Sequence, residues 1–427
     1  MTKDRASAIA RVIEQTDETT LASGLTKHKK MCLSPFLFYR GSAPLFYHDI
    51  AHKRIVPPEP ATHWPLTCVT GDCHASNFGF ITEEGSHGDN VIFAPNDFDD
   101  ACVGHAWWDI TRFIASLFLI ADHCQGECEG KYQAPTPPAG RHFASNGDVH
   151  NACRIFFSHY IETCSLVLQS PAARNSAVES VNTVDRMQKL MSKARQRAAG
   201  SEAFTTKSAL AKAVFMAQDG LKFQSRSDKF SVLSDEQYSE LSHHFSPYMD
   251  ENIADIVMRV NAGTGSVNLE RYYFLIGPAK PHDESTFARC HIVEVKRQRE
   301  AAPLIHFKSL SPVNRLNPAH LTARCQRKMQ RRPDLLLDEV YWRGAHWLVR
   351  SRHHAKVGVK PEDIALAKPG KPLAINTFAR MCGQSLALAH CRGDRRSDTF
   401  PAAVVATTDA HILQWVQCAQ HYAEHVV

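Results

Sequence analysis

Apolar residues recur with a helical period through most of the chain up to Pro247. Ser34-Pro35 offers a helix N-cap followed by proline, and a bend is expected near Gly41 and Pro44. The longest apolar stretch has nine residues, 113–121. Because a bilayer span needs roughly 20, this stretch predicts a buried helix. The pattern predicts helices over about 35–53, 107–123, 149–168 and 177–197.

Short β-prone runs mark the expected strands. Residues 77–82 and 90–94 are joined by a polar connection, which predicts a β-hairpin, and 67–70 predicts a short strand before it. Beyond Pro247 such runs dominate, so a sheet-rich unit is expected there. Its expected elements are strands near 256–260, 272–276 and 291–295, a helix over about 318–331, a hairpin of 335–342 with 346–350, and a closing helix over about 375–390.

These elements predict an α+β protein with two lobes. The chain has 427 residues, whereas a single hydrophobic core stops growing at roughly 250 to 300. We expect an N-terminal arm (1–30), a helical lobe (31–250), a sheet-rich lobe (251–356), and C-terminal helices that pack back on the helical lobe (357–427).

Composition excludes several classes of protein. With 44% hydrophobic and 22% charged residues, the chain is neither disordered nor fibrous. A net charge of +5 is small for this length, so neither nucleic acid nor a membrane is expected as a partner. Thirteen cysteines without a small secreted framework fit a reducing compartment. The first thirty residues contain no signal-peptide pattern, and we therefore expect a cytoplasmic protein.

Polar residues gather where two predicted β-segments end. Gly71-Asp72-Cys73-His74-Ala75-Ser76-Asn77 follows the strand at 67–70, and Asn96-Asp97-Phe98-Asp99-Asp100 follows the hairpin. Carboxylate and amide oxygens are the ligands that Mg²⁺ prefers, and one further carboxylate can orient a hydroxyl nucleophile. Either segment alone is better explained as a turn, since Gly, Asp, Asn and Ser are the commonest turn formers.

The two segments together resemble the aminoglycoside phosphotransferase and choline kinase branch of the protein-kinase-like superfamily. Its catalytic loop reads Gly-Asp-x-His-x-x-Asn and precedes a β-hairpin, Asp-Phe, and an Asp at a helix start. The resemblance implies that Asp72 is the catalytic base, with His74 in the same loop. It also implies that Asn77 and Asp97 bind Mg²⁺ and that Asp109 anchors the loop.

Most of the chain is also similar to a bacterial family known as domain of unknown function 2252. The similarity lies in segments 34–41, 71–79, 96–99, 293–296 and 387–390. This family name supplies no reaction, and it implies only that these segments belong together in one protein.

A kinase-like enzyme needs a lobe that covers ATP, and here that lobe must follow the catalytic loop. The segment 261–267 resembles a glycine-rich loop, in which the backbone of Gly263, Gly265 and Ser266 would approach phosphates. Val293-Glu294-Val295-Lys296 is similar to the strand that ends in the phosphate-pairing lysine. A plain hairpin and a solvent-facing lysine are the alternatives. The order of elements predicts a circularly permuted protein-kinase-like fold.

Other residues are expected near the same cleft. Protein kinases pair the strand lysine with a helix glutamate, but the helix at 318–331 contains none, so Gln326 is the candidate acceptor for Lys296. Arg350, Arg352 and Lys356 leave the last strand of the sheet-rich lobe and are candidates for binding phosphate or an acidic substrate, with a solvated basic face as the alternative. His390 and Arg392 end the last helix and are further candidates for the rim of the cleft, with compensation of the helix dipole as the alternative.

The sequence favours an ATP- and Mg²⁺-dependent phosphotransferase that acts on a hydroxyl of a small-molecule acceptor. Nucleotidyl transfer on the same fold stays open. So does a metallophosphoesterase, because Gly-Asp-x-His also occurs in di-metal sites, and so does a non-catalytic nucleotide-binding regulator, because the helix glutamate is missing. No motif encodes the acceptor or the oligomeric state.

Overall fold

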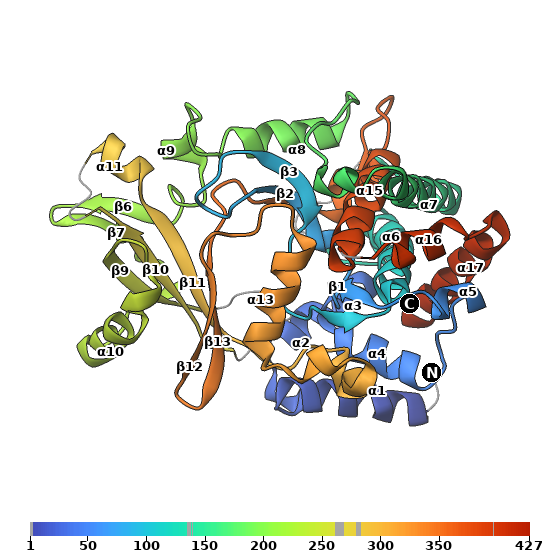
Figure 1. The fold of residues 1–427 in the computed structure, drawn as a ribbon, viewed down its shortest axis with the longest axis horizontal. Coiled ribbons are helices and arrows are strands. Elements are labelled where there is room, and N and C mark those ends of the chain that lie inside the picture. Colours follow the sequence, from blue (N-terminus) through green and yellow to red (C-terminus); the bar gives the residue numbers. More distant parts are fainter. Residues whose placement is uncertain (1–2, 135–137, 139, 261–268, 279–282, 396) are drawn as a thin grey trace.

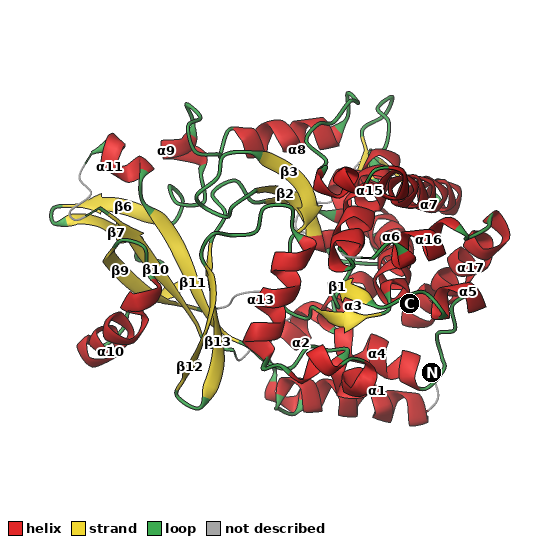
Figure 2. Cartoon of the chain, viewed as in Figure 1, coloured by secondary structure: helices red, strands yellow, loops and turns green. Residues whose placement is uncertain are grey.

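The chain folds into a helical lobe and a sheet lobe that lie side by side (Figure 1). This computed structural model describes residues 3–134, 138, 140–260, 269–278, 283–395 and 397–427. Helices gather at the right of Figure 2, and the long strands of a large antiparallel sheet lie at the left. The α+β class predicted from the sequence is therefore confirmed.

The helical lobe is built around one long buried helix. The helices of this lobe are α1 (Lys3–Asp17), α2 (Thr26–Met31), α3 (Pro35–Gly41), α4 (Ala43–Ala51), α5 (Glu59–Thr62), α6 (Ala106–Glu129), α7 (Asn146–Gln169), α8 (Arg186–Arg195), α12 (Leu304–Phe307), α14 (Pro361–Ile364), α15 (Ile375–Gly393), α16 (Thr399–Val405) and α17 (Asp409–Val426). Every residue from 113 to 121 in α6 is buried, as the apolar stretch predicts. Helices α15 and α16 pack on α7, and α17 packs on α6.

Local sequence signals account for the ends of several helices. Ser34 caps α3 by accepting a hydrogen bond from the Leu37 N–H, and Ser42 separates α3 from α4 at the predicted bend. The helix predicted from residue 177 instead begins at Arg186, because the Asp185 side chain accepts hydrogen bonds from the first turn. Earlier in the segment predicted to be helical, Val178 instead forms an antiparallel β-bridge with Phe93.

Short strands in the helical lobe carry the polar segments. They are β1 (Thr67–Val69), β2 (Phe78–Thr82), β3 (Val91–Pro95), β4 (Cys102–Gly104), β5 (His142–Phe143), β14 (Val357–Gly358) and β15 (Leu366–Ala367). The predicted hairpin is confirmed, since β2 pairs with β3 in antiparallel register from Phe78 opposite Pro95 to Thr82 opposite Val91. Strand β14 comes much later in the chain, after the last strand of the sheet lobe, and adds a third strand beside β2.

The sheet lobe has a six-stranded antiparallel sheet in the order β12-β13-β11-β10-β9-β8. Its elements are α9 (Phe204–Lys207), β6 (Val214–Ala217), β7 (Gly220–Phe223), β8 (Phe230–Ser231), α10 (Asp235–Phe245), β9 (Asn252–Arg259), β10 (Arg271–Gly277), α11 (Glu284–Ala288), β11 (His291–Arg297), β12 (Leu337–Trp342) and β13 (Ala345–Ser351). Arg271 and Tyr273 of β10 lie opposite Lys296 and Glu294 of β11, so these four side chains share one face of the sheet.

The sequence predicts that the sheet lobe begins at residue 251. In the structure, residues from Phe204 onward already pack with the sheet. Phe204, Leu210 and Val214 share a hydrophobic cluster with sheet residues, and Leu241 and Phe245 of α10 pack on the other side of the sheet. The strands before β9 have only two to four residues each, too few to show two-residue alternation clearly.

Helix α13 (Pro318–Met329) joins the two lobes, and Figure 1 shows it between them. Its Leu321 and Cys325 belong to the core of the helical lobe, whereas Ala319 and Ala323 pack against β12 and β13 of the sheet. The lobes therefore share a helix with two buried faces. None of the helices described here is long and apolar enough to cross a membrane.

Gly71 at the end of β1 occupies a position that only glycine fits. Its φ is +76°, and a Cβ atom there would lie 1.8 Å from the backbone oxygen of Asp100. We expect Gly71→Ala to lower the free energy of unfolding by about 2–4 kcal/mol, from the positive φ and the overlap together. Gly200 has the same φ sign with no atom within 4 Å, so Gly200→Ala should cost only about 1–2 kcal/mol. Urea unfolding measures the free energy of unfolding of both variants. Equal losses of stability would contradict the expected overlap between the Cβ atom and the Asp100 backbone.

Candidate functional site

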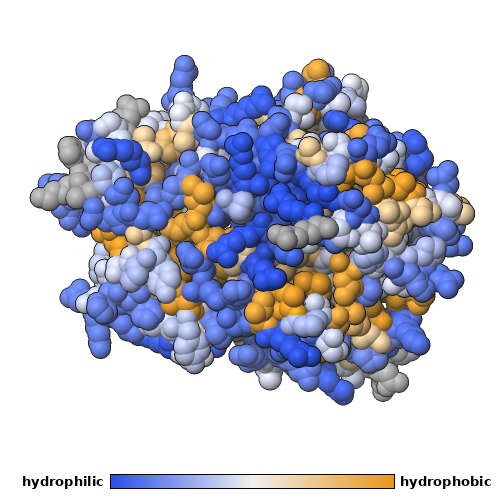
Figure 3. Space-filling model, viewed as in Figure 1, coloured by the Kyte–Doolittle hydropathy of each residue, from blue (hydrophilic) through white to orange (hydrophobic). Residues whose placement is uncertain are grey.

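The two lobes enclose a polar cleft of about 370 Å³. Figure 3 shows hydrophilic side chains along the middle of the molecule, between the two lobes. The residues predicted for catalysis, Mg²⁺ binding and phosphate binding that the structure describes line this cleft: Asp72, His74, Asn77 and Asp97 from the helical lobe, and Lys296, Gln326, Arg350 and Arg352 from α13 and the sheet lobe. Gly263, Gly265 and Ser266 lie outside the described residues, but Arg259 and Leu269, which flank that segment, line the cleft.

Asp109 in the first turn of α6 holds the loop that carries Asp72. Its buried carboxylate accepts hydrogen bonds from the backbone N–H groups of Thr70 at 2.7 Å and Gly71 at 3.1 Å, and from the Thr70 hydroxyl at 2.9 Å. Nε2 of His390 lies 3.2 Å from the same carboxylate. The loop contact that the resemblance implies for Asp109 is therefore present.

Asp72 points into the cleft and is held by a buried arginine. Nε of Arg112 donates to the Asp72 carboxylate at 2.7 Å, and a second guanidinium nitrogen lies 2.6 Å from the same oxygen. The guanidinium also lies over the Tyr39 ring at 4.3 Å and donates to the Tyr39 carbonyl. Because Arg112 is fully buried, its charge requires the Asp72 carboxylate, and this pairing fixes the orientation of Asp72.

His74 lies behind Asp72 as a neutral imidazole. Burial, together with the positive charges of Arg40 and Arg112, lowers the pKa of His74 well below its ordinary value. Its Nε2 is 3.7 Å from the Asp72 carboxylate, and its Nδ1 has no hydrogen-bond partner among the described residues. Burial also raises the pKa of the neighbouring Cys73 thiol, so Cys73 lacks the thiolate character of a nucleophile.

Asn77 and Asp97 supply oxygen atoms on the helical side of the cleft. The Asn77 amide nitrogen donates to the Asp72 carbonyl at 2.9 Å, which orients its side chain, and the Asn96 N–H donates to the Asn77 carbonyl. Burial and the nearby Asp99 carboxylate raise the pKa of Asp97 to about 6. Two neighbouring carboxyl groups, with the Asn77 side chain lining the same cleft, fit a hard divalent cation such as Mg²⁺.

Lys296 at the cleft end of β11 pairs with Asp99. Its side chain is 2% exposed, and its ammonium group donates to the Asp99 carboxylate. Burial opposes ionisation of Asp99, but Lys296 and Arg350 outweigh it and hold the pKa of Asp99 far below its ordinary value. Gln326, the acceptor expected for Lys296, instead donates to Gln330 at 3.2 Å. That expectation is corrected, because a carboxylate satisfies a buried ammonium better than an amide does.

Two arginines complete the charged wall of the sheet lobe. Glu294 accepts hydrogen bonds from Arg350 at 3.0 Å and from Arg271 at 3.1 Å, and Arg350 also lies 3.4 Å from Asp99. Burial works against the charge on Glu294, but Arg271 and Arg350 lower its pKa to about 2. Although burial opposes their charge, the carboxylates raise the pKa of Arg271 and Arg350, whereas burial lowers the pKa of Lys296 despite Asp99. All three side chains line the cleft.

The remaining candidates fall into two groups. Arg352 and Lys356 line the cleft, where Arg352 donates to the Tyr273 hydroxyl and Lys356 donates to the Asn96 carbonyl at 3.1 Å. His390 and Arg392 do not line it. His390 is buried behind Asp109, where it also accepts from the Tyr160 hydroxyl, and Arg392 donates to backbone carbonyls inside the helical lobe. The rim position expected for these two residues is therefore corrected.

The sequence missed Arg40 and Asp99 as cleft residues, and it missed Arg112, which is buried behind Asp72. Arg112 carries a signal in retrospect, since a charge within an apolar helix must meet a buried anion. Arg40 lines the cleft with its Nε unpartnered among the described residues, and the sequence marks it only as part of the family segment 34–41. Asp99 lies in the Asp-Phe-Asp-Asp run, but nothing local shows that it would meet Lys296, 197 positions away.

The raised pKa of Asp97 gives a stability prediction for the ligand-free protein. The pKa is 3.8 for an unperturbed Asp and about 6 for Asp97, so ionising this group removes stability as pH rises from about 4 to about 6. The difference corresponds to at most about 3 kcal/mol. We expect Asp97→Asn to be more stable than the wild type by about 1–3 kcal/mol at about pH 8, with a smaller gain at about pH 5. Urea unfolding at the two pH values measures the stability of the variant and of the wild type. A stability gain that is the same at both pH values would contradict the raised pKa of Asp97.

The fold and the cleft together define a class: a two-lobed α+β protein whose lobes jointly form a charged cleft large enough for a small-molecule ligand. The chain belongs to a bacterial family, since the family model described as "Uncharacterized protein conserved in bacteria (DUF2252)" matches residues 23–133 and 139–427. The similarity to this family expected from the sequence is thereby confirmed. Comparisons with curated proteins and with solved structures gave no match.

Proposed function

We propose that this protein is an ATP- and Mg²⁺-dependent phosphotransferase that acts on a hydroxyl of a small-molecule acceptor. One observation carries the proposal. Residues from the catalytic-loop segment, the Asp-Phe segment and the β11 lysine, as far apart as positions 72 and 296, line one cleft between the two lobes. Their chemistry is that of phosphoryl transfer, which needs a base, oxygen ligands for a metal, and cations for phosphate.

Asp72 would act as the base on the acceptor side. Its carboxylate is fixed by Arg112 and is 18% exposed toward the cleft, so it can accept or orient the proton of a hydroxyl group placed there. Arg112 is fully buried and cannot itself reach an acceptor. Its role is to hold Asp72 in one orientation.

The sheet lobe would supply the phosphate-binding cations. Among the described residues that line the cleft, eight are Arg or Lys and six are Asp or Glu, which favours an anionic ligand that brings a cation with it. Lys296, Arg271 and Arg350 would stabilise phosphate oxygens. Asn77 and Asp97 would hold Mg²⁺, which neutralises the phosphates when bound.

The order of elements supports a circularly permuted protein-kinase-like fold for this activity. The catalytic loop and its hairpin come first, and the strand pair β9–β10, the lysine strand β11, helix α13 and the hairpin β12–β13 follow. Asp99 would take the place of the helix glutamate as the anion beside Lys296. A metallophosphoesterase is less well supported, because the one close three-residue His/Cys/Asp/Glu group among the described residues contains neither Asp72 nor His74.

Incubation with α- or γ-labelled ATP, Mg²⁺ and a panel of hydroxyl compounds tests the proposal. Transfer of the γ label to an acceptor is the expected result. Transfer of the α label would show nucleotidyl transfer instead of phosphoryl transfer. ATP binding without transfer of either label would favour a non-catalytic nucleotide-binding regulator. Absence of ATP binding would contradict the phosphotransferase, the nucleotidyl transferase and the regulator alike.

A further inference from the structure

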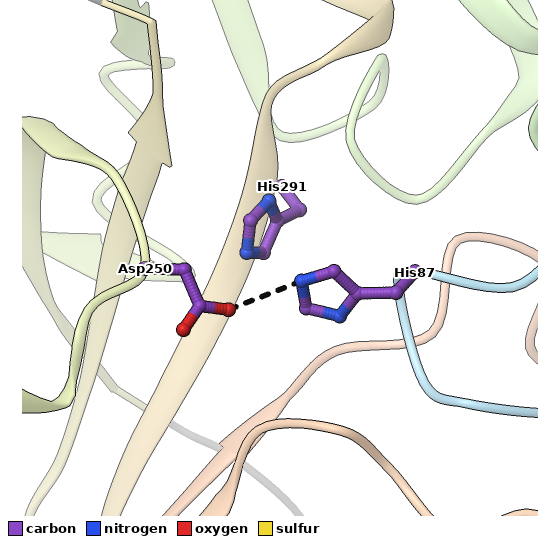
Figure 4. Close-up of side chains that lie close together, drawn as sticks. All are labelled: His87, Asp250 and His291. Atoms are coloured by element: carbon purple, nitrogen blue, oxygen red, sulfur yellow. Dashed lines mark ion pairs between the residues drawn. The ribbon is translucent and has the colours of Figure 1, made fainter.

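A second group of polar side chains lies outside the cleft, where the β2–β3 connection meets the sheet lobe. His87 comes from that connection, Asp250 from the residues just before β9, and His291 from the first position of β11. Figure 4 shows the three side chains converging from these separate segments. One nitrogen or oxygen atom from each lies within 4.8 Å of the other two.

The spacing of these atoms suits a small transition-metal ion. Zn²⁺ binds His nitrogen and carboxylate oxygen at about 2.0–2.2 Å in tetrahedral geometry, which places ligand atoms about 3.4 Å apart. Nε2 of His87 lies 3.2 Å from Oδ2 of Asp250. The third ligand is within 4.8 Å of both, so a small side-chain rotation would bring it to the same spacing.

His291 gives an independent sign of a missing ligand. Only 6% of this residue is exposed, and its Nε2 has no hydrogen-bond partner among the described residues. Buried polar side-chain atoms in proteins almost always have a partner, so an unpartnered ring nitrogen at this depth points to a ligand that satisfies it.

We propose that His87, Asp250 and His291 form a Zn²⁺-type metal site that ties the β2–β3 connection to the ends of two strands of the sheet lobe. Three protein ligands leave one coordination position for water. Because the β2–β3 hairpin belongs to the helical lobe and the other two ligands belong to the sheet lobe, the bound ion fixes the orientation of the lobes. This site does not depend on the function proposed for the cleft.

Metal binding by the tag-free chain tests the site directly. Protein stripped with a chelator is titrated with Zn²⁺ against a chromophoric chelator and with Co²⁺ by visible absorption. We expect one equivalent per chain and a higher midpoint of thermal unfolding with metal. Co²⁺ bound by imidazole and carboxylate should show d–d bands without the intense sulfur-to-cobalt absorption of thiolate ligands.

Two variants and a matched control assign the ligands. His87→Gln and His291→Gln should each weaken Zn²⁺ binding at least tenfold. His63→Gln should leave binding unchanged, because this exposed histidine directly follows α5, which lies at the end of the molecule away from the sheet lobe (Figure 1). The His87 side chain is 27% exposed, so His87→Gln should fold, which circular dichroism checks. Any of three results would overturn the proposal: no binding of one Zn²⁺ per chain, Zn²⁺ binding by His87→Gln as tight as by the wild type, or a sulfur-to-cobalt absorption band.

Discussion

Asp72→Asn is expected to lower the rate of γ-phosphoryl transfer by two to four orders of magnitude. An amide cannot accept the proton of the acceptor hydroxyl, and general-base catalysis typically contributes a factor of about 10²–10⁴. Arg112 holds the Asp72 carboxylate at 2.6–2.7 Å, so the substitution also weakens the fixed orientation of this residue. The measurement is initial transfer of γ-labelled phosphate to the acceptor that the panel identifies.

The control for this variant is Asp122→Asn. Asp122 lies on the same helix as Arg112 but outside the cleft, and it accepts from the Tyr132 hydroxyl. Its variant should transfer phosphate at the wild-type rate. Asp72→Asn should still be stabilised by ATP with Mg²⁺, because the phosphate-binding side chains are untouched. A transfer rate within about threefold of the wild type would remove Asp72 from the role of base.

Asp109→Ala is expected to destabilise the helical lobe by about 3–5 kcal/mol. The Asp109 side chain is fully buried and accepts hydrogen bonds from two backbone N–H groups and the Thr70 hydroxyl, with His390 beside it. Removing the carboxylate leaves several buried donors without an acceptor, and each such donor costs roughly 1–3 kcal/mol. The loop that carries Asp72 would lose its anchor, so transfer activity should fall as well.

Urea unfolding of Asp109→Ala and Asp122→Ala separates this effect from a general loss of charge on α6. The Asp122 side chain is 26% exposed, and its ion pair with Lys131 spans 3.5 Å, so Asp122→Ala should cost less than about 1 kcal/mol. A comparable loss in the two variants would show that the buried hydrogen bonds of Asp109 contribute little.

Signals that are local in sequence predicted the elements that carry the site. The hairpin β2–β3 follows from alternating β-prone runs with a polar connection, and the split between α3 and α4 follows from Gly41 and Pro44. The convergence of Asp72 with Lys296 came from a resemblance rather than from the residues themselves. Periodicity reports which side of an element is apolar, but it does not report which distant element covers that side.

What could not be predicted depends on long-range pairing. Lys296 meets Asp99 rather than Gln326 because the helical lobe places that carboxylate opposite β11. His390 and Arg392 are buried because α15 packs against the helical core, so polar residues at its end find buried partners instead of solvent. Very short strands such as β8, with two residues, have no period to detect.

The most direct test of the central claim is thermal unfolding with and without ATP and Mg²⁺, for the wild type and Asp97→Asn side by side. At a ligand concentration about 100-fold above Kd, binding adds roughly 2.7 kcal/mol to the free energy of unfolding and raises the midpoint of thermal unfolding by several degrees. We predict a Mg²⁺-dependent rise for the wild type that Asp97→Asn loses, even though this variant starts from a higher midpoint at about pH 8. No rise in either protein at millimolar ATP would contradict a nucleotide site in the cleft.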